Sequence, residues 1–295
     1  MQTVNDIDTS DLFNLMNMAK DLKKYYNDPM DRPELLKGYI FGLLFFEPST
    51  RTCLSFESAI NRLGGKVIKY NSNYSSEQKG ESLEDTIRTI NSYVDVFIIR
   101  HPEKNIFVKI KNFTDKPIIN AGDGDGEHPT QALLDLFTIL EYYPSLPNNI
   151  TFTGDIKFSR TIHSLVYLLK KLKSDIKFYF VSDEYLEPND SLTKDLNFSI
   201  LREIDSIIDK IDVLYVTRIQ KERHLETGIS YKKTIVNKNL IDKSKENLII
   251  MHPLPRNDEL SKDLDNNSKS KYFEQVENGV YVRMSILLFL LHKGP

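Results

Sequence analysis

The chain has 295 residues, of which 39 are Lys or Arg and 42 are Asp or Glu, giving a formal net charge of −3. At about 150 residues per domain, this length predicts one large or two modest domains, whose core needs no disulfide or metal staples. The near-neutral charge offers no electrostatic basis for nucleic-acid binding, and 40% hydrophobic and 27% charged residues argue against extended disorder.

Strand-like and helix-like stretches alternate along the first half of the chain. A capping signal at Thr9, Ser10 and Asp11 precedes residues 12–26, whose apolar spacing is helical. The other elements expected here are strands at 38–46, 67–70, 95–100 and 117–120 and helices at 50–63, 81–93 and 129–142.

The alternation starts again after residues 143–149, where two prolines indicate a hinge between two halves. The elements expected beyond it are strands at 150–153, 176–181, 212–217 and 248–251 and helices at 159–172, 203–210 and 280–291. Helices between strands imply parallel sheets covered on both faces. The sequence therefore predicts an α/β fold with two doubly wound halves, in which the polar segments 71–79 and 222–239 are loops.

Ligands of open α/β sheets bind outside the carboxyl ends of the strands, so the residues that follow each strand are candidate site residues. The first strand is followed by Glu47-Pro48-Ser49-Thr50-Arg51-Thr52, which opens a helix. Hydroxyls, a guanidinium and the unpaired N–H groups of a helix start together predict a phosphate or oxyanion site. The structural alternative is that Ser49 and Thr50 only cap the helix and that Arg51 is a solvated charge.

Further cations and polar groups follow the other strands. The first half supplies Arg100 and the run His128-Pro129-Thr130-Gln131; the second supplies Asp155, Arg160, Arg218, Gln220 and the run His252-Pro253-Leu254-Pro255-Arg256. Each could be structural when taken alone, and His252 could be an ordinary imidazole at a strand end. Together the four arginines outnumber the carboxylates at these positions, Glu47 and Asp155. The sequence therefore predicts one or two ligands with several negative charges, and the Pro-Leu-Pro run indicates a cis peptide bond.

No nucleophile, metal or cofactor motif accompanies these residues. The phosphate-binding and dinucleotide-binding glycine patterns, the GxSxG nucleophile turn and HExxH are all absent from the sequence. We therefore expect no cofactor and no metal, and direct transfer between two bound substrates that is catalysed by positioning and electrostatic stabilisation.

The single cysteine, Cys53, excludes an intrachain disulfide and fits a reducing compartment. The apolar runs are much shorter than the ~20 residues that span a bilayer, and the N-terminal sequence does not resemble a signal peptide. We expect a cytoplasmic protein that binds neither membrane nor nucleic acid, with Cys53 buried in a helix and without a catalytic role.

Several of these segments resemble the carbamoyltransferase family. FFEPSTRT (45–52), IRHP (99–102), HPTQALLD (128–135) and GDxxxxRTxHSL (154–165) are similar to its motifs, in order, across nearly the whole chain. TRIQKER (217–223) and MHPLPRNDE (251–259) are similar, more narrowly, to the members that use aspartate as acceptor. Two departures are a single lysine, Lys79, before Gly80, where some members have two, and Cys53, where some have Arg.

The resemblance implies transfer of the carbamoyl group from carbamoyl phosphate to L-aspartate, a step of pyrimidine biosynthesis. It implies a catalytic set of Arg51, Thr52, Lys79, Arg100 and His128. The implied carbamoyl phosphate-binding residues are Ser49, Thr50, Arg51, Thr52, Ser75, Arg100, His128, Gln131, Pro253 and Leu254. The implied aspartate-binding residues are Lys79, Arg160, Arg218, Gln220 and Leu254.

The resemblance also implies an architecture. A carbamoyl phosphate-binding domain is expected over 1–131 plus 277–295 and an aspartate-binding domain over 132–276, bridged by interdomain helices and closing on the substrates. A homotrimer is expected in which Ser75 and Lys79 enter the active site of the neighbouring subunit; a regulatory chain or larger assembly is left open. The alternatives are another acceptor amine, such as ornithine, or an inactive binding homologue.

Overall fold

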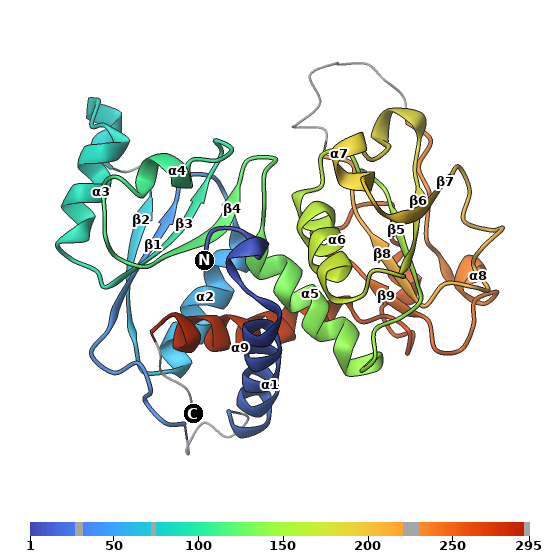
Figure 1. Ribbon diagram of the computed structural model, residues 1–295, viewed down its shortest axis with the longest axis horizontal. Coiled ribbons are helices and arrows are strands. Elements are labelled where there is room, and N and C mark those ends of the chain that lie inside the picture. Colours follow the sequence, from blue (N-terminus) through green and yellow to red (C-terminus); the bar gives the residue numbers. More distant parts are fainter. Residues whose placement is uncertain (27–31, 72–74, 221–230, 292–295) are drawn as a thin grey trace. The chain divides into compact units, whose positions relative to one another are not determined.

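The computed structural model describes residues 1–26, 32–71, 75–220 and 231–291. The chain forms two compact units, one of Met1–Leu133 with Glu277–Pro295 and one of Leu134–Val276. Helices α5 (Pro129–Tyr142) and α9 (Tyr272–Leu290) contribute residues to both units, as Figure 1 shows. Within the described residues, no helix is long and apolar enough to cross a membrane.

Unit 1 is built on a parallel sheet. Its strands are β1 (Ile40–Phe45), β2 (Lys66–Asn71), β3 (Val96–His101) and β4 (Ile118–Asp123), in the order β2-β1-β3-β4. Its helices include α1 (Thr9–Tyr25), α2 (Thr50–Arg62), α3 (Leu83–Asn91) and the short α4 (Phe107–Ile110), with 3-10 turns at Val4–Asp6 and Ser76–Lys79. The strand order changes direction between β1 and β3, which is where open sheets of this kind bind ligands.

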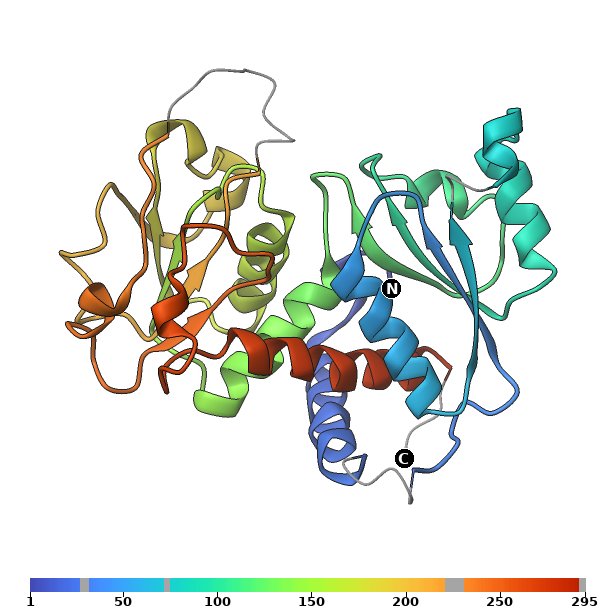
Figure 2. The ribbon, with the colours of Figure 1, turned by 180° about the vertical axis from the view of Figure 1, so that it is seen from behind.

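Alternating side chains explain why both faces of this sheet are covered. Leu44, Phe97 and Ile99 point to one face and join a buried cluster with residues of α3 and α4. Phe41 of β1 points to the other face, and a Cβ on Gly65 would meet both its ring, at 3.0 Å, and Ile60 of α2, at 2.8 Å. Figure 2 shows α2 from this side.

Unit 2 is built on a second parallel sheet. Its strands are β5 (Asn149–Thr153), β6 (Lys177–Val181), β7 (Asn197–Leu201), β8 (Val213–Val216) and β9 (Ile249–Met251), in the order β7-β6-β5-β8-β9. Its helices include α6 (Arg160–Leu172) and the short α7 (Asp190–Thr193) and α8 (Lys238–Ile241), with 3-10 turns at Glu184–Leu186 and Lys262–Leu264. Here the order changes direction between β5 and β8.

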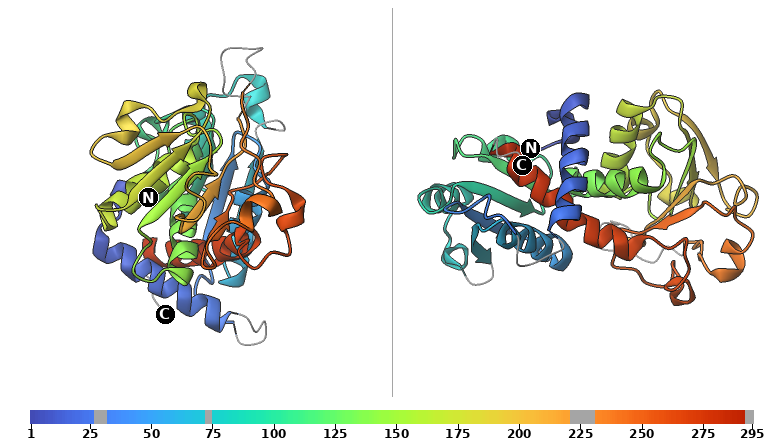
Figure 3. Two further views of the ribbon diagram at one scale, coloured as in Figure 1. Left: turned by 90° about the vertical axis from the view of Figure 1, so that its right-hand side faces the viewer. Right: turned by 90° about the horizontal axis from the view of Figure 1, so that it is seen from below.

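The two faces of the second sheet are also both buried. Phe152 on one face lies 5.6 Å from Tyr215 and 5.9 Å from Phe180, between ring centroids. Leu214 and Val216 on the other face belong to a cluster with aliphatic residues from 204–264. Figure 3 shows α6 and these later segments on opposite faces of the sheet.

The structure confirms the predicted α/β fold with two doubly wound parallel sheets, and most predicted elements lie within two residues of the observed ones. One predicted helix, 203–210, is wrong: the segment forms successive turns. The N–H of Ile207 donates to Ile204 and that of Lys210 to Ile207, so each bond spans three residues. The isoleucines at 204, 207 and 208 are buried, and their spacing is the same as on the apolar face of a helix. Isoleucine is β-branched, however, and β-branched residues have a lower helix propensity.

Four other points need correction. The cap of α1 is Asp8, whose carboxylate accepts the N–H of Asp11 at 2.8 Å. The last helix begins at Tyr272 rather than 280 and runs through Asn278, whose Oδ1 accepts a hydrogen bond from Lys23 at 2.8 Å. Strand β7 was not predicted; its sequence, NFSIL, is short, and most of its residues are exposed at the sheet edge. Cys53 is half-buried rather than buried, and burial raises the pKa of its thiol.

Gly154 directly follows β5, and the chain after β8 approaches it closely. Its φ is +108°, and a Cβ would lie 2.0 Å from the carbonyl oxygen of Thr217 after β8. We expect Gly154→Ala to lower the free energy of unfolding by about 3–5 kcal/mol, from backbone strain and overpacking together. Gly38→Ala is the matched control, because Gly38 has a φ of +92° and nothing within 4 Å of its Cβ position. Urea titrations that gave equal losses for both variants would contradict the close approach.

Candidate active site

The start of α2 forms the first part of the candidate site. Ser49 is its N-cap residue, but its side chain makes no capping hydrogen bond to the helix. Thr50 and Arg51 in the first turn are exposed. The hydroxyl of Ser49 is therefore not committed to capping, and it lies beside the unpaired N–H groups of the helix start, which favour an anion.

Thr52 and His128 meet in the interior of unit 1. Thr52 Oγ1 lies 3.4 Å from His128 Nε2, and both side chains are buried. The carbonyl oxygen of His128 accepts the N–H of Gln131 at 3.0 Å, so the start of α5 fixes the backbone at His128. Gln131 is half-buried in the first turn of that helix.

Arg100 near the end of β3 lies beside a carboxylate. Its Nε is 2.7 Å from Glu47 Oε1, and the two side chains are only 14% and 21% exposed. Glu47 follows β1, and β1 and β3 are hydrogen-bonded neighbours, so the two strand ends bring the pair together. Glu47, one of the two carboxylates that the sequence analysis found among the cations, thus contacts Arg100.

Ser75 and Lys79 follow the edge strand β2. Ser75 accepts a hydrogen bond from the hydroxyl of Tyr70 at 2.8 Å and caps the 3-10 turn that carries Lys79. The Lys79 side chain is exposed, and Gly80 ends the turn in the left-handed conformation. The turn is therefore anchored at Ser75 while the ammonium group faces outward.

Asp155 links the segments that follow β5 and β8, the two strands between which the strand order of unit 2 changes direction. Its Oδ1 accepts the N–H of Phe158 at 3.1 Å, and its Oδ2 accepts the N–H of Gln220 at 3.0 Å. Gln220 Nε2 in turn donates to the carbonyl of Phe158 at 3.0 Å. These bonds hold the segment after β8 against the turn that leads into Arg160, the first residue of α6, which is 5% exposed.

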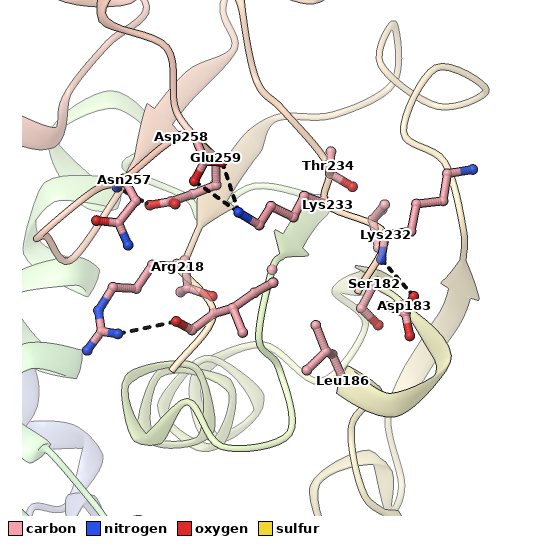
Figure 4. A pocket seen from close by; sticks show the side chains of 14 residues that line it. Ser182, Asp183, Leu186, Arg218, Lys232, Lys233, Thr234, Asn257, Asp258 and Glu259 are labelled. Carbon is pink, nitrogen blue, oxygen red and sulfur yellow. Dashed lines mark hydrogen bonds and ion pairs between the residues drawn. The ribbon is translucent and has the colours of Figure 1, made fainter. Parts of the chain in front are cut away.

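Arg218 lines a cavity of about 300 Å³ at the carboxyl ends of β5, β6 and β8. Its Nη1 donates to the carbonyl of Ile219 at 3.2 Å. In Figure 4 the Arg218 guanidinium points away from Lys233, which pairs with Asp258 at 2.8 Å. Arg218 thus lies directly after β8, at the strand end where the sequence analysis places it.

The turn after β9 carries Pro253 and Leu254. The Leu254–Pro255 peptide is cis, as predicted, and Leu254 has a φ of +54°. The last residue of the HPLPR run has a structural partner: Arg256 makes a bidentate ion pair with Asp265 and holds the pKa of that carboxyl at about 2.

The candidate residues thus fall into two sets. Unit 1 holds Ser49, Thr50, Arg51, Thr52, Ser75, Lys79, Arg100, His128 and Gln131; unit 2 holds Arg160, Arg218, Gln220, Pro253 and Leu254. The four arginines lie at or just after the ends of the strands between which the strand order changes direction, β1 and β3 in unit 1 and β5 and β8 in unit 2. Among residues whose placement is described, no three His, Cys, Asp or Glu side chains are grouped to hold a metal ion.

Fold and site together define an α/β protein in which arginine and hydroxyl side chains gather at the carboxyl ends of the strands of two parallel sheets, and comparison with known proteins narrows this class. The family model for the aspartate/ornithine carbamoyltransferase carbamoyl-P binding domain matches residues 1–141, and the model for the Asp/Orn binding domain matches 148–290. The chain belongs to the aspartate/ornithine carbamoyltransferase family.

The relatives are aspartate carbamoyltransferases. The catalytic subunit of Vibrio campbellii is 42% identical over 99% of this chain and 96% of its own, and that of Thermoplasma volcanium is 43% identical over 98% and 97%. Among solved structures, aspartate transcarbamoylase of Trypanosoma cruzi with carbamoyl aspartate and phosphate is 37% identical, covers 97% of this chain and 94% of its own, and has a TM-score of 0.90. The same enzyme with N-(phosphonacetyl)-L-aspartic acid also has a TM-score of 0.90 and 37% identity, covering 97% and 93%.

Proposed function

We propose that this chain transfers the carbamoyl group of carbamoyl phosphate to the amine of L-aspartate, giving N-carbamoyl-L-aspartate and phosphate for pyrimidine biosynthesis. The observation that carries the proposal is the pair of guanidiniums in unit 2, Arg160 after β5 and Arg218 after β8. A dicarboxylate acceptor needs two cations, and the planar fork of arginine suits a carboxylate.

We assign the carbamoyl phosphate to unit 1. The start of α2 with Ser49, Thr50 and Arg51 binds the phosphate, assisted by Arg100 and by Ser75. Thr52, Arg100 and His128 polarise the carbonyl oxygen of the carbamoyl group, and the 3.4 Å distance between Thr52 and His128 supports their acting on one atom. Gln131 and the backbone of Pro253 and Leu254 bind the carbamoyl amino group.

We assign the aspartate to unit 2. Arg160 binds the α-carboxylate, Arg218 and Gln220 bind the β-carboxylate, and the backbone of Leu254 orients the amine. Lys79 reaches both substrates. The hydrogen bonds of Asp155 support this assignment, because they hold Gln220 and the turn before Arg160 in a fixed relation.

The reaction needs no covalent intermediate on the protein. The aspartate nitrogen attacks the carbamoyl carbon, a tetrahedral oxyanion forms next to Thr52, Arg100 and His128, and the C–O bond to phosphate breaks. The proton lost by the nitrogen is taken up by the leaving phosphate. The protein lowers the barrier by positioning the substrates and by stabilising the oxyanion.

We further propose a cytoplasmic homotrimer with shared active sites. The single cysteine fits a reducing compartment. The exposed Lys79, on an anchored turn beyond the edge strand β2, is suited to donation into a neighbour's site. A closed ring allows such donation, because each subunit gives one surface and receives another.

The acceptor tests the proposed function directly. We expect purified protein with carbamoyl phosphate to carbamoylate aspartate at least ~10³-fold faster, per kcat/KM, than ornithine, because a site built for a buried charged group rejects a substrate that lacks it. A colorimetric assay of the ureido product measures both. Equal or faster turnover of ornithine would assign the chain to another acceptor, and no turnover of either would make it a binding homologue.

A further inference from the structure

His252 supports the backbone of the turn after β9 from within. The N–H of Leu254 donates to His252 Nδ1 at 2.8 Å. Because Nδ1 accepts this bond, the hydrogen-bond network assigns the ring proton to Nε2. Nε2 lies 2.9 Å from Glu259 Oε1 and donates to it. One imidazole thus holds Leu254 with one nitrogen and is itself oriented by the other.

Glu259 fixes the far side of the same turn. Its Oε1 also accepts the N–H of Asn257 at 3.0 Å, and it is 6% exposed beside the 1% exposed His252. Burial alone would raise the pKa of Glu259, but hydrogen bonds from His252 and Asn257 hold this pKa below its ordinary value. The carboxylate is therefore present as an acceptor at neutral pH, and the tautomer of His252 is fixed.

A buried network anchors the backbone of His252 to the two helices that flank it. The N–H of His252 donates to Gln275 Oε1 at 3.0 Å, and Gln275 Nε2 donates to Asp135 Oδ1. The hydroxyl of Tyr215 donates to the other oxygen of Asp135 at 2.7 Å. Gln275 belongs to α9, Asp135 to α5 and Tyr215 to β8, so three elements of unit 2 determine where His252 lies.

The conformation of Leu254 explains why such support is needed. Its φ of +54° is unfavourable for a side chain with a Cβ and persists only where neighbouring groups determine it. The bond from its N–H to His252 is one such determinant, and it spans only two residues of the turn. Loss of this bond would leave Leu254 able to return to a more common conformation, which would move the carbonyls of Pro253 and Leu254.

We propose that His252 is a positioning residue of the active site: through Nδ1 it holds the backbone of Leu254 in the conformation that receives the carbamoyl amino group and the acceptor amine. The proposal rests on the proposed function, in which that backbone contacts both substrates. His252 itself is buried and acts through Leu254 rather than by touching substrate.

Two substitutions separate the two ring nitrogens. In His252→Asn, the amide oxygen can take the place of Nδ1 and accept the N–H of Leu254, but the donor to Glu259 is lost. In His252→Gln, the amide nitrogen can take the place of Nε2 and donate to Glu259, but the acceptor for Leu254 is lost. We expect His252→Gln to lower kcat/KM for aspartate by about 10²-fold and His252→Asn to retain most of it, although both lose one buried hydrogen bond.

A matched control tests whether lost stability alone could produce this difference. Asp212 accepts the N–H groups of Asn148 at 3.1 Å and Asn149 at 2.8 Å, at the amino ends of β5 and β8 in the same sheet. Asp212→Ala removes hydrogen bonds of the same kind together with the ion pair between Asp212 and Lys245, and we expect a lower melting temperature with unchanged KM for aspartate. Equal kinetic losses in His252→Asn and His252→Gln, or losses that follow melting temperature across all three variants, would overturn the positioning role. A wild-type protein without carbamoyltransferase activity would instead refute the proposed function.

Discussion

Arg51→Ala and Lys79→Ala are each expected to lower kcat by about 10²–10³-fold, because each removes a cation from the charge that develops as phosphate leaves. Arg51 belongs to the first turn of α2, and Lys79 to the turn after the edge strand β2. Single variants do not distinguish a lysine that acts in its own subunit from one that acts in a neighbour's. Mixed trimers do, because the two residues then come from different chains.

Unfolding and reassembling an equal mixture of the two inactive variants should restore activity. An active site is intact only where the Lys79 variant supplies Arg51 and the Arg51 variant supplies Lys79, and every mixed ring of three has one such junction. About three quarters of randomly assembled trimers are mixed, and one site in three works in each, so roughly a quarter of wild-type activity should return. The steady-state rate per chain after reassembly measures this fraction.

The matched control mixes Arg51→Ala with Arg100→Ala. Arg51 lies in the first turn of α2, after β1, and Arg100 lies near the end of β3, so both belong to unit 1. In the proposal both act in their own subunit. No junction in such a mixed ring holds both arginines, so no activity should return. No activity in the Arg51 and Lys79 mixture would show that Lys79 acts within its own chain, and activity in this control would show that recovery does not depend on a site shared through Lys79.

The architecture could be predicted from the sequence where the signals are local. Buried parallel strands are short apolar runs, and the residues after them are found by counting forward, so Arg100 and Arg218 could be assigned to strand ends from their positions in the chain. The start of α5 coincides with the prediction because Pro129 marks the first helical position. The segment 203–210 failed because isoleucines at helical spacing also fit a series of turns.

Contacts between distant residues could not be predicted in this way. Gln275 and Asp135 are 140 residues apart, and nothing in either local sequence indicates that they meet. His252 could therefore be interpreted as an ordinary imidazole at a strand end, although the short spacing to Glu259 was available as a signal. The sequence indicated which side chains are candidates to contact a ligand, but not which side chains hold them in place.

Arg218→Ala is expected to raise KM for aspartate by about 10²-fold, since breaking a desolvated bidentate charge pair costs about 2–5 kcal/mol. The side chain is half-buried, and the fixed position of Gln220 beside it, through the N–H bond to Asp155 at 3.0 Å, limits how far other groups can compensate. Arg218→Lys keeps the charge without the planar fork, so it should recover only part of the loss. Steady-state kinetics with saturating carbamoyl phosphate measure both variants.

Succinate separates binding of the acceptor from chemistry, because it carries the two carboxylates of aspartate without the amine. Its inhibition constant should rise in Arg218→Ala by about the same factor as KM for aspartate, as expected where a residue contributes equally to ground state and transition state. The KM for carbamoyl phosphate should stay within about twofold of wild type, because its phosphate-binding residues belong to unit 1. An unchanged inhibition constant for succinate would show that Arg218 does not bind the acceptor, and a parallel loss of carbamoyl phosphate binding would mean that the substitution damages the fold instead.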